Sequence, residues 1–313
     1  MGGFLTALGQ KLAERWLSLL VLPGALYIAV ATTSHALGHT HPFDLARLTD
    51  QITTWAEHHP ATDTAGGQVL LLAAVLAGAA AAGLAAQAIG SLVERLWLAA
   101  DWPTWPPPFR QLAAWRTIRR RRRWTSAADA WHQHRDDAAE IRTRRQWADP
   151  TARHAAERAM TRIAYEKPAR PTWSGDRLNA AAVRLDRDHG LDLVIVWPPL
   201  WLTLPEETRT EITAARQALT RATTVAAWAL LYLPLTAWWW PAALITTALT
   251  LTARVRTRAA SHTYALLLEA TTRLHARDLA DRLGVDATGP LTPEVGDTLT
   301  RHLTPTPPPR PIV

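Results

Sequence analysis

The chain of 313 residues contains no cysteine, so disulfide frameworks, thiol catalysis and cysteine-ligated zinc are excluded. It also lacks GxxxxGK[ST], GxGxxG, GxSxG and HExxH, the motifs of phosphate-loop, dinucleotide-binding, serine-hydrolase and zinc-protease sites. Lysine is almost absent: of the 34 lysine and arginine residues, only Lys11 and Lys167 are lysines. With the abundant Ala and Thr, this bias is typical of a GC-rich genome, so arginine content alone does not indicate nucleic-acid binding.

Three stretches lack charged residues altogether, over lengths that matter to a membrane. A helix needs about 20 apolar residues to cross the ~30 Å hydrocarbon core, and residues 16–34 and 66–93 each predict one such span. The third stretch, 222–253, has 32 residues and would run about 48 Å as one helix. It therefore predicts a transmembrane hairpin whose return helix begins at Pro241.

The first stretch has a second interpretation, a cleaved signal peptide. Lys11 and Arg15 supply a basic flank, and Ala29-Val30-Ala31 resembles a cleavage site. A retained span is favoured because Pro23-Gly24 falls in mid-segment and an amphipathic lead precedes it. In either case the following loop, 35–65, lies outside.

Charge distribution predicts the orientation. The loop 35–65 carries one arginine against four acids, whereas residues 94–221 carry 23 basic and 16 acidic side chains. The positive-inside rule then places both termini and this region in the cytoplasm of a bacterial inner membrane. We expect an all-α integral membrane protein with four transmembrane helices and a mainly helical cytoplasmic region. Its predicted parts are an amphipathic lead with two spans (1–93), an Arg-rich cytoplasmic region (94–221), a hairpin (222–253), cytoplasmic helices (254–303) and a Pro-rich tail (304–313).

Small and aromatic residues mark expected packing and interfacial positions. The face formed by Gly78, Ala79, Ala82 and Gly83 is typical of membrane helices that approach closely, and it favours a homo-oligomer. Tryptophans suit the headgroup depth of a bilayer. The interfacial anchors predicted on this basis are Trp102, Trp105, Trp197, Trp201, Trp238, Trp239 and Trp240.

The stretch WRTIRRRRRW (115–124) is the most basic in the chain. Its arginines are the predicted contacts for anionic lipid or, alternatively, nucleic acid, and only two or three can face one partner because a helix points consecutive side chains in all directions. The inner leaflet is the nearer polyanion, since the stretch follows the second span by some twenty residues. The residues concerned are Arg116, Arg119, Arg120, Arg121, Arg122 and Arg123.

Residues 193–205 (LVIVWPPLWLTLP) are uncharged but broken by Pro198-Pro199. We expect a strand-like or extended segment at the inner membrane face, with a buried strand of a small soluble core as the alternative. The chain from Pro171 to Pro205, the WWWPA turn and YALLLEATTRLHARDLADRLG resemble uncharacterised multi-span membrane proteins of high-GC actinobacteria. That resemblance implies a bacterial integral membrane protein and no named activity.

Possible sites of chemistry are few. His35, His39 and His41 have no diagnostic metal spacing, and the acids of 186–192 fit a solvated helix end better than a catalytic pair. The tail TPTPPPRPIV has a PxxPxR pattern typical of a polyproline II ligand, although a disordered tail is the plainer interpretation.

These observations favour a non-enzymatic membrane protein without cofactor or metal. It would act as the membrane anchor or membrane-perturbing effector of a multi-component bacterial system, engaging lipid and unidentified protein partners. The alternative is a membrane-bound nucleic-acid handling or DNA-transfer component that uses the Arg-rich region. An enzyme with a site near Asp186 to Asp192 is the weakest of the three hypotheses.

Overall fold

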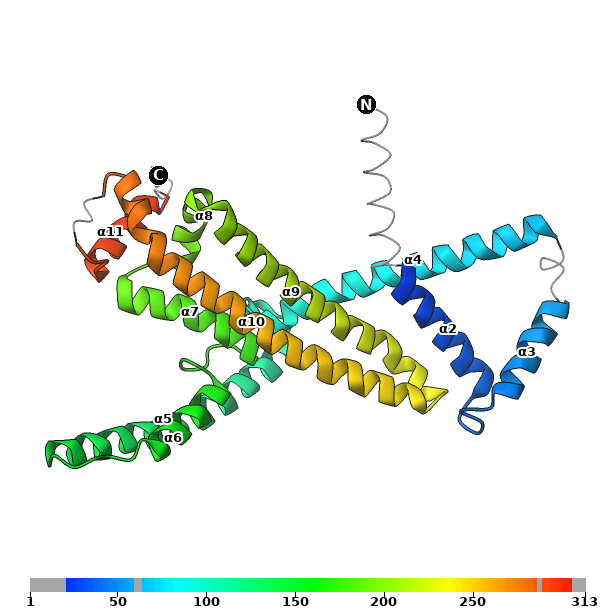
Figure 1. Ribbon diagram of the computed structural model, residues 1–313, viewed down its shortest axis with the longest axis horizontal. Coiled ribbons are helices and arrows are strands. Elements are labelled where there is room, and N and C mark those ends of the chain that lie inside the picture. The colour runs from blue at the N-terminus through cyan, green and yellow to red at the C-terminus, as the bar shows by residue number, and fades with distance from the viewer. Residues whose placement is uncertain (1–20, 59–63, 286–288, 306–313) are drawn as a thin grey trace, which may run out of the picture. The chain divides into compact units, whose positions relative to one another are not determined.

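A computed structural model describes residues 21–58, 64–285 and 289–305, with the side chains of 45, 52, 55 and 56 left out. Every regular element in these ranges is helical (Figure 1), as the sequence predicts. The amphipathic lead, the start of the first predicted span and most of the Pro-rich tail lie outside the described residues. The elements are α2 (Leu22–Leu37), α3 (Leu45–His58), α4 (Ala65–Leu98), η3 (Trp102–Thr104), α5 (Pro107–Thr143), α6 (Thr151–Ile163), α7 (Trp173–His189), α8 (Leu193–Thr203), α9 (Glu206–Tyr232), η4 (Leu233–Ala237), α10 (Pro241–Arg282) and α11 (Pro293–Leu303).

The chain divides into two compact units. Unit 1 comprises residues 1–94 and 220–256, and unit 2 comprises residues 95–219 and 257–313. All three uncharged stretches of the sequence fall within unit 1, whereas the arginine run falls in unit 2.

Helix α4 packs in unit 1 through a stripe of small residues. Its buried positions begin with Ala79, Gly83, Ala86 and Gly90, which recur at helical spacing on one face. A Cβ on Gly24 of α2 would overlap the carbonyl oxygen of Ala79, so the two backbones are in direct contact there. The close helix partner expected from the small-residue face is therefore a helix of the same chain.

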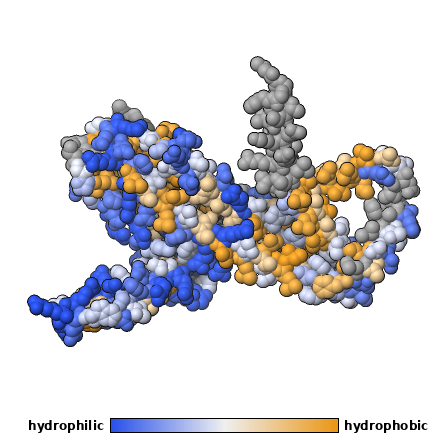
Figure 2. Space-filling view, viewed as in Figure 1, coloured by the Kyte–Doolittle hydropathy of each residue, from blue (hydrophilic) through white to orange (hydrophobic). Residues whose placement is uncertain are grey.

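Much of the remaining surface of α4 is apolar and exposed. Only 17% of its most hydrophobic 18-residue window is buried, although that window has a mean hydropathy of 2.4. Val69, Leu70, Leu72 and Leu84 are all at least 49% exposed. Figure 2 shows hydrophobic residues gathered over this part of the molecule. A core helix of a water-soluble protein would bury such residues.

Two helical segments in the described ranges are long and apolar enough to cross a membrane: α4 and the continuous stretch Glu206–Ala237, which joins α9 to η4. The described part of α2 has 16 residues, and the uncharged part of α10 ends before Arg254, thirteen residues after the helix starts. Neither of these uncharged described segments reaches the usual ~20 residues. The number of spans, predicted as four, and their orientation stay predictions.

The predicted hairpin is present as a fold element. Helix α9 ends in the 3-10 turn η4, and α10 begins at Pro241 directly after the three tryptophans. The Trp239 indole donates to the Pro42 carbonyl oxygen at 3.0 Å, and Trp240 meets Phe43 edge to face at 5.8 Å. Trp238 and Trp240 are about half exposed, at 53% and 45%. The turn thus presents aromatic surface while Trp239 fastens it to the α2–α3 connection.

Unit 2 has its own hydrophobic core. Leu185 of α7, Val196 and Leu200 of α8, Leu279 of α10 and Leu299 of α11 are buried together in it. Gly190, with φ of 63°, ends α7 in the left-handed conformation that glycine adopts readily at a helix C-cap. The amino end of α11 packs against this corner so closely that a Cβ on Gly296 would overlap the His189 carbonyl oxygen.

The expectation for residues 193–205 is wrong, because residues 193–203 form the helix α8 and not a strand or extended segment. The Asp192 side chain accepts from the Val194 N–H and caps the helix. Pro198 and Pro199 each remove one backbone donor, but burial of Val196 and Leu200 on one face offsets that loss. Tertiary packing has overridden the local signal.

The arginine run lies on one continuous helix, α5, which has 37 residues. Helix α6 folds back along α5 after a short connection, and the pair is visible in Figure 1. Proline at 106 and 107 starts α5, where a missing backbone N–H costs nothing. The buried positions of α5 are all small residues, namely Ala113, Thr117, Ala128 and Ala138.

Candidate functional site: the arginine helix and its basic pocket

The arginines of the run have different surroundings. Arg120 is bound within unit 2, where its guanidinium donates to Asp176 at 2.7 Å and to the Ile163 carbonyl oxygen at 2.8 Å. Arg119 lies over the Trp115 ring at 5.5 Å. Arg116 and Arg123 are exposed. One of the six predicted contact residues is therefore committed to the fold, and the rest are not equivalent.

Asp176 connects three parts of unit 2. One carboxylate oxygen accepts from the N–H groups of Ala169 and Arg170, and the other accepts from Arg120 of α5. Its side chain is 3% exposed. Burial raises the pKa of Asp176, while the Arg170 N–H and the Arg120 charge act in the opposite direction. This carboxylate holds the loop before α7 against the arginine helix.

That loop also caps the end of α4. The Thr172 hydroxyl donates to the Trp97 carbonyl oxygen and accepts from the Gly175 N–H, and Arg170 donates to the Leu98 carbonyl oxygen at 3.2 Å. The last carbonyls of a helix have no partner within the helix. Side chains from the loop therefore satisfy them, which fixes the loop that carries Lys167.

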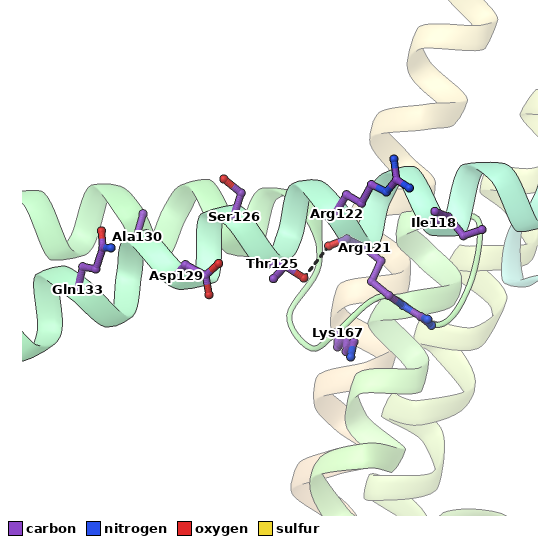
Figure 3. Close-up of a pocket in the computed structure, with 9 residues that line it drawn as sticks. All are labelled: Ile118, Arg121, Arg122, Thr125, Ser126, Asp129, Ala130, Gln133 and Lys167. Carbon is purple, nitrogen blue, oxygen red and sulfur yellow. Dashed lines mark hydrogen bonds between the residues drawn. The ribbon is translucent and has the colours of Figure 1, made fainter.

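A basic pocket opens between α5 and this loop, with a volume of about 830 Å³. Arg121, Arg122 and Lys167 contribute its positive charge, and Asp129 is its acid. In Figure 3, Arg121 extends toward the loop that carries Lys167, whereas Arg122 leaves the helix in a different direction. The remaining lining residues are Ile118, Thr125, Ser126, Ala130 and Gln133.

The pocket is suited to an oxyanion. The Nε–H of Arg121 already donates to the Pro168 carbonyl oxygen at 3.2 Å, which orients the guanidinium. Its terminal nitrogens, the Lys167 ammonium and the Ser126 hydroxyl are donors in the lining, whereas the Thr125 hydroxyl donates to the Arg121 carbonyl oxygen at 3.0 Å. Phosphate groups are bound by this combination of guanidinium, ammonium and hydroxyl donors. No nucleophile with an adjacent base is part of the lining.

A second polar cluster lies on α7 and α10. Arg177 is 1% exposed, stacks over the Tyr165 ring at 4.6 Å and donates its Nε–H to His262 at 3.1 Å. Arg184 pairs with Glu166 at 3.0 Å and approaches Glu269 at 3.9 Å. These contacts join α7, α10 and the loop after α6. The contacts give the buried Arg177 and the partly buried Arg184 hydrogen-bonding or charged partners, and we assign them a structural role.

This cluster makes the stability of unit 2 depend on pH. Burial, and then the neighbouring Arg177 charge, lower the pKa of His262. The unfolded chain has an ordinary histidine pKa of about 6.5, so it binds more protons than the folded chain just below that pH. The contribution of neutral His262 to the free energy of unfolding is fully present above about pH 6.5. It is lost as the pH falls toward the lowered pKa of the folded state. We expect His262→Gln, which keeps an acceptor for Arg177, to reduce the drop in melting temperature between about pH 7.5 and pH 5.5. An unchanged drop would contradict this role.

The other predicted residues are distributed as follows. Trp102 donates its indole N–H to the Ala169 carbonyl oxygen at 3.0 Å, and Trp105 is half-buried in the same turn region. The Trp197 and Trp201 rings of α8 are 5.8 Å apart and pack against the core of unit 2. Their assignment as interfacial anchors stays a prediction.

The histidines and acids considered as possible metal or catalytic groups have other surroundings in the structure. Within the described residues, no group of three His, Asp or Glu side chains is arranged to hold a metal. Asp188 pairs with Arg187 at 3.0 Å and with Arg273 at 3.1 Å, and Asp192 caps α8. Asp188 therefore serves as a pairing group and Asp192 as a capping group.

Sequence reasoning missed Lys167 and Asp176. Lys167 is 44 or more residues from the run it joins, and only the α5–α6 hairpin brings it there. Its rarity, as the only lysine after residue 11, is the one signal in the sequence that could have pointed to it. Asp176 falls in the first turn of α7, where an acid is ordinarily explained by the helix dipole.

No protein-family model matches the chain, and comparison with curated proteins and with solved structures likewise gave no match.

Proposed function

We propose that this is a non-enzymatic integral protein of a bacterial inner membrane whose α5–α6 hairpin binds the phosphate groups of anionic lipid. It has four spans, α2, α4 and the two arms of the α9–α10 hairpin, and its termini are cytoplasmic. Such a protein serves as the membrane anchor or membrane-perturbing effector of a multi-component system. The observation that carries the lipid-binding part is the pocket of Arg121, Arg122 and Lys167.

The membrane part of the proposal is supported by α4. This apolar helix of 34 residues buries small side chains and exposes leucine and valine. A helix of a water-soluble protein shows the reverse pattern, with its large apolar side chains buried. It matches membrane helices, which pack through small residues and turn larger apolar ones to lipid. Extraction of cell membranes with alkaline carbonate should leave the protein in the pellet, and its release to the supernatant would rule out integral insertion.

The lipid part predicts that the variant Arg121→Gln/Arg122→Gln/Lys167→Gln binds short-chain phosphatidylglycerol at least about tenfold more weakly than the parent. The reason is that each basic side chain near anionic lipid contributes about 1 kcal/mol. Titration calorimetry of the full-length protein in a neutral detergent measures the change.

The matched control is Arg116→Gln/Arg119→Gln/Arg123→Gln, which removes the same number of positive charges from positions of α5 outside the pocket. It should bind with near-parental affinity, and equal losses in both variants would mean that the pocket is not the site. The second arm offers a single-stranded oligonucleotide of about 20 nucleotides at ~50 mM salt, where phosphate contacts are strong. Pocket-dependent binding of that strand in preference to the lipid would favour the nucleic-acid alternative.

A further inference from the structure

A second hollow lies in unit 2, between α8, α9 and α10. It has a volume of about 560 Å³ and is mainly apolar. The two indoles of α8, 5.8 Å apart and tilted by 42°, form one wall with Leu202. Ile212 of α9 and Tyr264 of α10 form the other side. We call this hollow the aromatic groove.

One end of the aromatic groove is acidic. A neighbouring hollow shares Trp201, Thr213 and Gln217 with it and extends to Glu206 in the first turn of α9. Glu207 and Glu211 line a further hollow beside Glu206. Arg209 pairs with Glu206 at 2.6 Å, but the Glu206 side chain remains 80% exposed. The groove thus combines two tilted aromatic rings with a set of carboxylates at one end, and its own lining also includes Arg216.

Helix α11 brings the end of the chain to α8. Thr300 accepts from the Asp192 N–H and donates to the Gly190 carbonyl oxygen, which fixes α11 on the α7–α8 connection. Leu303, its last residue, packs against the same core cluster as Trp197, Trp201 and Tyr264. The residues that follow Pro305 read TPPPRPIV. The chain therefore leaves the described part of unit 2 beside the helix that forms a wall of the groove.

We propose that residues 306–313 bind in the aromatic groove of their own chain. Grooves lined by tryptophan and tyrosine accept proline-rich segments, whose rings stack on the aromatic faces at little entropic cost. Arg310 supplies the charge that complements Glu206, Glu207 and Glu211. In the polyproline II conformation, eight residues at 3.1 Å each extend about 25 Å. This length exceeds the ~10–12 Å diameter of a helix, so the segment is long enough to cross α8.

The absence of cysteine allows a direct test on the full-length chain. The variant Val313→Cys takes a single nitroxide label, whose electron paramagnetic resonance spectrum reports its mobility. We expect a restricted spectrum in the parent. Arg310→Glu, and separately Leu202→Lys, should at least double the mobile fraction, because each places like charges together or removes apolar wall.

The matched control is Val194→Lys. Val194 and Leu202 lie on the same helix and are equally exposed, at 80% and 79%, but only Leu202 lines the groove. Because both side chains are largely exposed, neither substitution removes core packing, and we expect both variants to fold. Val194→Lys should leave the spectrum restricted. Identical spectra for the parent, Leu202→Lys and Val194→Lys would overturn the proposal.

Two further outcomes assign a different occupant. If dilution or mixing with unlabelled protein changes the spectrum, the tail binds a second copy. If the label is restricted only in liposomes and mobile in detergent, the tail contacts lipid. Either result contradicts the intramolecular site, and neither bears on the basic pocket, whose binding is measured independently.

Discussion

Replacing Asp176 with alanine is expected to lower the free energy of unfolding of unit 2 by about 3–5 kcal/mol. The change leaves three donors without their acceptor, namely the N–H groups of Ala169 and Arg170 and the guanidinium of Arg120. Arg120 keeps the Ile163 carbonyl oxygen but loses its counter-charge in a largely buried position. Thermal unfolding followed by tryptophan fluorescence should show a melting temperature lower by roughly 10 °C.

The control for Asp176 is Asp136→Ala. Asp136 also pairs with an arginine, Arg135, but at 3.4 Å and with a side chain that is 69% exposed. A solvated pair of this kind contributes less than about 1 kcal/mol, so the melting temperature should move by a few degrees at most. Similar shifts in the two variants would show that Asp176 does not have the connecting role assigned to it.

Enlarging Gly24 should separate α2 from α4. A Cβ at this position would overlap the backbone of Ala79, so even alanine requires one helix to move, and overpacking of this kind costs about 1–3 kcal/mol. Gly24→Leu should cost more. Because the chain has no cysteine, cross-linking between cysteines introduced at Ile28 and Gly78, which approach each other in the parent, measures the contact.

Gly66→Ala is the control for this contact. Gly66 lies on α4, and a Cβ there would meet nothing within 4 Å. Alanine also has the higher helix propensity, by about 1 kcal/mol, so cross-linking should stay at the parental level. Parental cross-linking in Gly24→Leu would mean that α2 and α4 do not depend on this close approach.

Local chemistry made several helix boundaries predictable from sequence. Pro241 begins α10 and Gly190 ends α7, because proline fits a first helical turn and glycine accepts a positive φ. The helical continuation of the second uncharged stretch to Leu98 also agrees with the sequence, since the breakers start only at Asp101-Trp102-Pro103. In these places the deciding residues are neighbours in the chain.

Residues that act at a distance were not predictable in the same way. The prolines of α8 indicate an extended segment, and only the burial of Val196 and Leu200 reverses that preference. The arginine run could be identified, but its division into a structural Arg120 and the pocket-lining Arg121 depends on Asp176 and on Lys167, both far along the chain. A pattern of neighbouring residues contains no information about which of five equal arginines meets such a partner.

Three helices run without a break through the boundary between the two units. The unit boundaries at residues 94/95, 219/220 and 256/257 fall inside α4, α9 and α10. A fragment cut at these points would end in severed helices, each with unpaired backbone groups that no loop replaces. The proposed lipid binding of the arginine helix should therefore be measured in the intact chain, and mutants should be compared in that chain and not in excised pieces.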